Sequence, residues 1–86
     1  MVKPKFRLTR SIVIATGGRV KDAREERGWS QEELGERSSL HQSTIGRVEK
    51  GSRDVGMETL ILIALALDRT LHELLPPPSA WLEGAV

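Results

Sequence analysis

Residues 57–67 read METLILIALAL, with one charged side chain, Glu58, in eleven positions. A helix that is apolar on nearly every side is typical of a protein interior, because each large side chain gains free energy when it leaves water. The run is far shorter than the roughly 20 apolar residues that a membrane-spanning helix needs. We therefore expect a central buried helix in a small domain, with other helices packed around it.

Start and stop signals divide the rest of the 86 residues. Ser30 with Glu33, and Thr70 with Glu73, match the capping box that opens a helix. Gly28 is a natural stop for the helix before it. The sequence thus predicts an all-α, compact domain of five helices, at 19–27, 31–37, 42–50, 57–67 and a short segment from 71 that the prolines at 76–78 end.

The two ends of the chain allow more than one interpretation. Residues 6–16, FRLTRSIVIAT, favour a strand through their β-branched side chains, or a short extra helix that Gly17 and Gly18 terminate. Beyond the last helix, an extended tail offers Trp81 and Leu82 to the domain or to a second copy. The predicted division is an N-terminal extension (1–18), a helical domain (19–75) and a proline-rich tail (76–86).

Charge is unevenly distributed along the chain. Residues 1–27 carry eight basic and three acidic side chains, residues 28–55 carry four and five, and residues 56–86 carry one and four. This asymmetry fits a basic end that meets a polyanion, or an ordinary solvated terminus. The basic residues before the first helix are accordingly either a phosphate-binding arm or a solubilising tail: Lys3, Lys5, Arg7 and Arg10.

Composition argues against several classes of function. The chain has no cysteine, which excludes disulfides and thiolate metal sites, and His41 and His72 are its only imidazoles. It shows no Ser/His/Asp or Cys/His set and no phosphate-cradling glycine loop, so we expect neither an enzyme nor a bound cofactor or metal. The apolar part of the N-terminal segment is too short for a secretory signal. We expect a cytoplasmic protein with no membrane segment.

Residues 31–50 place a helix, a turn and a second helix within twenty positions. Gly35 is a small residue at the point where the two helices would approach each other. The apolar positions are few: Leu34, Leu40, Ile45 and Val48. This is the pattern of a helix-turn-helix, whose second helix lies in the major groove of DNA.

The predicted second helix leaves most of its surface to short polar side chains. Glutamine can bond adenine through two hydrogen bonds, and arginine can bond guanine in the same way. Arg47 would otherwise contact a phosphate. The candidate base-contacting residues are Gln42, Ser43, Thr44 and Arg47, and Gly46 would allow DNA to approach closely.

Three motifs in order, REERGWSQEELGERSSLHQSTIGRVEKGSR, METL and LHELL, resemble the phage-repressor-like helix-turn-helix domain of lambda repressor, Cro and the XRE family. The resemblance covers residues 20–75. It implies a five-helix domain that binds double-stranded operator DNA, usually as a homodimer on a near-palindromic site. By position, it implies phosphate contacts from Gln31, Lys50 and Arg53, and a structural ion pair between Arg24 and Glu49.

Three positions depart from the family pattern. Ser39 stands where a turn glycine is usual, so another residue should adopt the left-handed conformation, or the turn should shift. Ser38 replaces an apolar residue, which should thin the packing. His41 occupies the usual Ser/Thr cap of the second helix and should cap it less well.

Two functions compete at this stage. The first is a sequence-specific, repressor-like transcriptional regulator that binds DNA. The second is an antitoxin-type or accessory module that holds a protein partner through the N-terminal segment or the Trp81 tail. Some apolar side chains exceed what a small core can cover and are candidates for a dimer surface, unless they are simply buried: Met57, Ile61, Leu65, Leu71 and Leu75.

Overall fold

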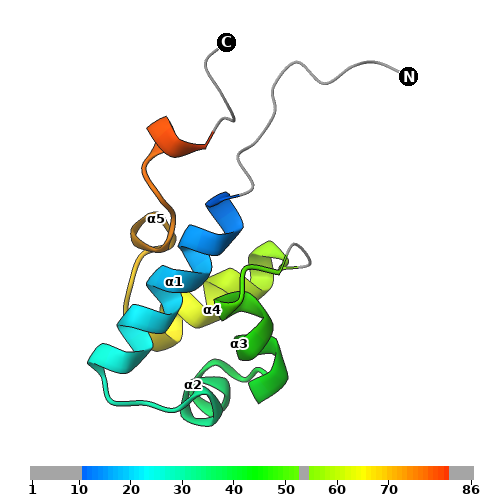
Figure 1. Cartoon of the computed structure of the whole chain (residues 1–86). Helices are drawn as coiled ribbons and strands as arrows, with labels where there is room; N and C mark the ends of the chain where they lie inside the picture. The colour runs from blue at the N-terminus through cyan, green and yellow to red at the C-terminus, as the bar shows by residue number, and fades with distance from the viewer. Residues whose placement is uncertain (1–10, 53–54, 82–86) are drawn as a thin grey trace.

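The computed structural model describes residues 11–52 and 55–81, and every regular element in these ranges is helical (Figure 1). The all-α, five-helix prediction is confirmed for this part of the chain. The elements are α1 (Ser11–Glu26), α2 (Gln31–Ser38), α3 (Gln42–Glu49), α4 (Met57–Leu67), α5 (Leu71–Leu74) and a 3-10 turn at Pro78–Ala80.

All five helices contribute to one apolar core. Leu34 of α2, Ile45 of α3 and Leu67 of α4 are fully buried in it. The remaining core residues are Val20, Ala23, Val48, Ile63, Ala64 and Leu74, and Leu40 in the turn after α2 packs against them. Burial of each large aliphatic side chain contributes about 1.5–3 kcal/mol, so this core fixes the angles between the helices.

The predicted capping signals mark the starts of α2 and α5. At α5 both halves of the capping box are present: Thr70 Oγ1 accepts from the Glu73 N–H at 3.1 Å, and the Glu73 carboxylate accepts from the Thr70 N–H at 2.9 Å. The Thr70 hydrogen bonds lower the pKa of the Glu73 carboxyl. At α2, Ser30 Oγ accepts from the Glu33 N–H at 3.1 Å, while the Glu33 carboxylate lies 3.5 Å from Arg37.

The first helix begins at Ser11, eight residues before its predicted start, and crosses the predicted boundary at residue 18. The strand prediction is therefore wrong for residues 11–16, and residues 6–10 lie outside the described ranges. Gly17 does not end a helix. A Cβ atom on Gly17 would lie 2.2 Å from the Val48 carbonyl oxygen, so the glycine allows α1 to cross the end of α3 at close range.

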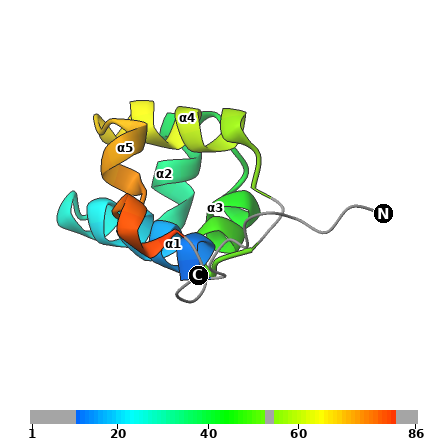
Figure 2. The ribbon, with the colours of Figure 1, turned by 90° about the horizontal axis from the view of Figure 1, so that it is seen from above.

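The prediction that α4 is a central buried helix is wrong, whereas the alternative that some of its apolar side chains exceed what the core covers is confirmed for three of them. Figure 2 shows α4 along the outer edge of the bundle. Met57, Ile61 and Leu65 are 70%, 42% and 72% exposed, because neighbouring helices cover only the opposite face of α4. No helix in the described ranges has the length and apolar character needed to cross a lipid bilayer.

The tail after α5 turns back on its own chain. Trp81 is partly buried, and its indole Nε1 donates to the Pro76 carbonyl at 2.7 Å. The segment Pro78–Ala80 forms a 3-10 turn where the sequence suggested an extended chain. Leu82, the other predicted packing residue of the tail, lies outside the described ranges.

The two neighbouring glycines of α1 provide a matched test of the close crossing. Gly17→Ala should lower the free energy of unfolding by about 2–3 kcal/mol, because the new methyl group meets backbone that cannot move aside. A Cβ atom at Gly18 would meet nothing within 4 Å. Gly18→Ala should therefore raise stability by up to about 1 kcal/mol through helix propensity. Urea denaturation measures both, and equal effects would contradict this packing of α1 on α3.

Candidate nucleic-acid interface

The turn between α2 and α3 keeps its tight geometry without a glycine. Ser39 itself adopts the left-handed conformation, with φ of 60°, so the expectation of another left-handed residue or a shifted turn is wrong. The Leu40 N–H donates to the Gly35 carbonyl at 2.8 Å. A Cβ atom on Gly35 would lie 2.7 Å from the Leu40 carbonyl oxygen, so a small residue is required there, as the sequence suggested.

Ser38 and His41 both form hydrogen bonds with neighbouring backbone groups. Ser38 is buried, and its hydroxyl donates to the Leu34 carbonyl at 2.7 Å, so no polar group is left unpaired there. His41 occupies the cap of α3 in an extended conformation, and its Nδ1 accepts from the Ser43 N–H at 3.1 Å. A histidine thus supplies the acceptor that serine or threonine usually supplies.

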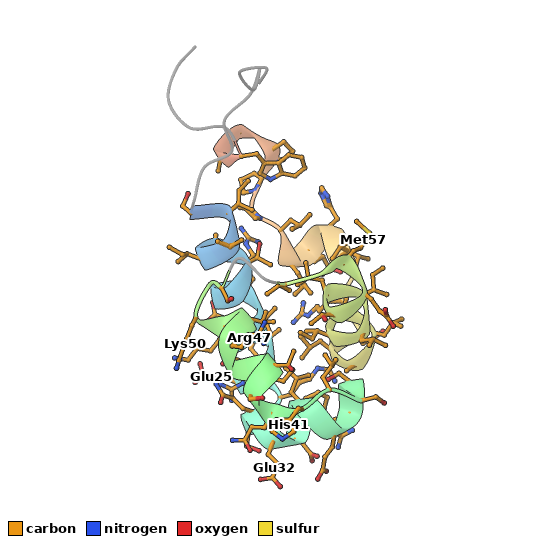
Figure 3. All side chains as sticks on the ribbon, turned by 90° about the vertical axis from the view of Figure 1, so that its right-hand side faces the viewer. Glu25, Glu32, His41, Arg47, Lys50 and Met57 are labelled. Atoms are coloured by element: carbon orange, nitrogen blue, oxygen red, sulfur yellow. The ribbon has the colours of Figure 1, made fainter. Side chains whose placement is uncertain are left out.

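The outward surface of α3 is polar and open. Gln42, Ser43, Arg47 and Lys50 are exposed, whereas Ile45 and Val48 face the core. Figure 3 shows His41, Arg47 and Lys50 in order along this helix. Side chains from α2, its following turn and α3 border a shallow concavity of about 440 Å³: Gln31, His41, Gln42, Ser43, Gly46, Arg47 and Lys50.

One described residue of the predicted set stands apart from this concavity. Thr44 is half-buried and is not among the lining residues. Arg53 lies outside the described ranges. The structure therefore brings together Gln31, Gln42, Ser43, Arg47 and Lys50 of the predicted set.

A buried ion pair between Arg24 and Glu49 fixes the orientation of α3 relative to α1. Arg24 of α1 holds Glu49 through two parallel hydrogen bonds, Nε to Oε2 at 2.7 Å and Nη2 to Oε1 at 3.0 Å. Only 10% and 4% of the two side chains are exposed. The hydrogen bond with Glu49 raises the pKa of Arg24, and burial opposes that change. Arg24 Nη1 also donates to the Trp29 carbonyl at 2.7 Å, which satisfies a third donor.

Gln31 joins this pair, and the sequence did not reveal that bond. Its Nε2 donates to Glu49 Oε1 at 3.1 Å. Its Oε1 would lie 3.6 Å from a Cβ atom on Gly46, an ordinary van der Waals distance, so the glutamine lies directly beside Gly46 of α3. Side chains from α1, α2 and α3 therefore meet at Glu49, and Gln31 is positioned at the edge of the exposed surface.

Trp29 strengthens the connection between α1 and α2. The guanidinium groups of Arg37 and Arg27 lie 4.3 Å and 5.1 Å from its ring centroid, within the range of a cation–π interaction. Arg27 Nη2 also donates to the Leu67 carbonyl at the end of α4, at 2.7 Å. These contacts join the loop after α1, α2 and the end of α4, and they were not predicted.

Comparison with known proteins agrees with this geometry. A family profile described as "Helix-turn-helix" matches residues 20–74, which is more than half of the chain. The chain belongs to the helix-turn-helix family, in its lambda repressor and Cro-like branch. The match begins inside α1, so the first nine residues of that helix precede it.

Three relatives illustrate this membership. Control protein C.SmaI of Serratia marcescens is 48% identical over 46 residues, which are 54% of this chain and 55% of that protein, so the chain spans about half the length of this curated relative. The restriction-modification controller protein C.AhdI of Aeromonas hydrophila is 37% identical, with a TM-score of 0.69 over 72% of this chain and 94% of that one. SinR, a master regulator of biofilm formation solved with DNA, is 28% identical, with a TM-score of 0.64 over 69% and 95%.

The buried ion pair leads to a stability prediction. Arg24→Met should lower the free energy of unfolding by about 3–5 kcal/mol, because it leaves the Glu49 carboxylate buried without a cation. Arg69→Met is the matched control: Arg69 lies 2.8 Å from Glu26, but the two side chains are 37% and 64% exposed. Its loss should cost less than about 1 kcal/mol. Chemical denaturation compares the two variants, and similar losses would argue against the role assigned to Glu49.

Proposed function

We propose that this protein is a sequence-specific, double-stranded DNA-binding transcriptional regulator that reads the major groove with α3. The observation that carries the proposal is the division of α3 into two faces. One face is buried and held by Arg24 through Glu49, and the other presents exposed polar side chains with no apolar cover. A recognition helix needs both properties, since base edges are read by short polar groups on a rigidly oriented helix. The named regulators among its relatives support the same function.

In this proposal, base contacts come from α3 and phosphate contacts come from its margins. Gln42, Ser43 and Arg47 face base edges from the exposed side, with Thr44 at the border of the core. Gln31, Lys50 and Arg53 contact phosphates. The hydrogen bond between Gln31 and Glu49 uses one amide hydrogen, which leaves its other hydrogen for a phosphate oxygen.

We also propose that the protein acts as a homodimer through the exposed side of α4. Met57, Ile61 and Leu65 follow one another at intervals of four residues and form a continuous apolar stripe. Figure 3 shows Met57 on the side of the molecule away from Arg47 and Lys50. A second copy is the occupant that fits, because an apolar stripe is complementary to itself across a two-fold axis. Such a dimer suits a near-palindromic operator with half-sites about 34 Å apart.

Binding to duplex DNA tests the recognition surface. Arg47→Ala should cost about 1–3 kcal/mol on the preferred duplex and relax the preference at one base pair. Lys50→Ala should weaken binding to all sequences alike and reduce the salt slope by about 1. Fluorescence anisotropy at several salt concentrations measures both.

The control for this experiment is Arg19→Ala. Arg19 borders a separate cleft between α1 and α5, so its loss should leave the base preference unchanged. If the unaltered protein retards no random duplex at low salt and another protein co-purifies with it, the interaction-module alternative replaces this proposal.

The oligomeric state tests the α4 stripe. Leu65→Glu should shift the protein to a monomer, because two copies would place like charges in an apolar contact. Ser79→Glu adds the same charge at an exposed position outside α4 and should leave the dimer intact. Analytical ultracentrifugation over a range of concentrations reports both. A stable dimer of the Leu65→Glu variant would locate the interface elsewhere.

A further inference from the structure

At the start of α3, His41 and Ser43 form an exposed pair of side chains, and the proposed function gives a role only to Ser43. His41 and Ser43 are both exposed, and both line the concavity beside α3. The Nδ1 atom of His41 lies 2.7 Å from Ser43 Oγ and 3.1 Å from the backbone nitrogen of the same serine. One ring nitrogen therefore contacts two possible donors of a single residue.

The positions of the hydrogen atoms follow from the backbone contact. A backbone N–H can only donate, so the Nδ1 atom that faces the Ser43 N–H must carry a lone pair. In this arrangement the hydrogen of the imidazole ring lies on Nε2. The Ser43 hydroxyl faces the same lone pair at 2.7 Å, and two lone pairs would repel each other at that distance. The hydroxyl must therefore turn its hydrogen toward His41.

This arrangement changes what Ser43 can recognise. A free serine hydroxyl rotates to donate or to accept, so it distinguishes poorly between base edges. With its hydrogen engaged by His41, Ser43 presents only lone pairs to a bound duplex. In the major groove, the partners for a lone pair are the amino groups of adenine (N6) and cytosine (N4), whereas guanine and thymine offer acceptors at the corresponding positions.

We propose that His41 is a positioning residue that makes Ser43 an acceptor-only reader, selective for an adenine or cytosine amino group. The inference rests on the proposed function, since it requires the first turn of α3 to lie in the major groove. It goes beyond that function because it assigns Ser43 the acceptor role in one base contact and names His41 as the residue that fixes this role. His41 also keeps its Nε2–H as a donor for a phosphate oxygen.

The test selects bound duplexes from a random pool at about pH 8, where imidazole is ordinarily neutral. The unaltered protein should prefer adenine or cytosine over guanine or thymine by about tenfold at one base pair. Ser43→Ala should abolish the preference at that pair alone. His41→Ala should broaden the preference at the same base pair so that guanine or thymine is also accepted, because the freed Ser43 hydroxyl can then donate.

His41→Asn is the matched control for capping. Asparagine is a good helix cap, and its side-chain oxygen can accept from both the Ser43 N–H and the Ser43 hydroxyl. It should therefore restore the amino preference that His41→Ala loses. Circular dichroism of the three variants checks that α3 remains folded in each.

Several outcomes would overturn the inference. If His41→Ala weakens binding to all duplexes equally and leaves the preference at the Ser43 pair unchanged, His41 is only a cap. If Arg47→Ala relaxes its own base pair while the Ser43 pair shows no amino preference, the DNA-reading function stands and this inference falls. Nitrogen-15 NMR of the free protein gives an independent readout, since a hydrogen on Nδ1 of His41 would exclude the arrangement without any DNA.

Discussion

The carboxylate of Glu49 is the point on which the orientation of α3 depends. It accepts from Arg24 of α1 and from Gln31 of α2 while it is itself part of α3. Buried charges cost several kcal/mol in lost hydration, and only good geometry with every donor and acceptor occupied offsets that cost. The parallel contacts of Arg24, together with its bond to the Trp29 carbonyl, meet this condition. A network of this kind tolerates one relative placement of three helices, which is what a reading surface needs.

The close crossing of α1 and α3 depends on backbone more than on side chains. Gly17 lets the carbonyl groups of Val48 and Glu49 approach the helix axis, and Gly51, with φ of 81°, turns the chain away beside Ile14. The part of α1 before residue 20 lies outside the family match. It adds two helical turns against the C-terminal end of α3, close to Lys50. The additional turns thus support the end of the recognition helix where phosphate contacts are proposed.

Local signals in the sequence predicted the local features of the fold. The capping residues Ser30 and Thr70 fixed the starts of α2 and α5, because a cap is a contact between residues three positions apart. The need for a small residue at Gly35 was also predicted locally, although the prediction was a close approach of the two helices and the structure places the backbone of the turn there. The exposed polar face of α3 was predicted for the same reason, since helical spacing alone separates it from Ile45 and Val48.

Long-range packing decided what the sequence could not show. Two adjacent glycines predict a helix break, yet at Gly17 the backbone of a distant helix takes the space of the side chain. The sequence offered five apolar side chains as surplus to the core, and only the packing of α4 shows that Met57, Ile61 and Leu65 are the exposed ones. The bond from Gln31 to Glu49 and the stacking of Arg27 and Arg37 on Trp29 join residues that only the folded chain brings together.

The short length of α3 explains why the proposed function needs two exposed surfaces, the polar face of α3 and the apolar stripe of α4. Eight residues rise about 12 Å, roughly a third of one DNA turn, so a single copy contacts only three or four base pairs. Each base pair contributes about 1–3 kcal/mol of discrimination, which is too little to single out one site among a genome of competing sequences. A second copy doubles the number of base pairs read. The apolar stripe on α4 lies apart from α3, so the proposed dimer would leave the polar face of α3 open to DNA.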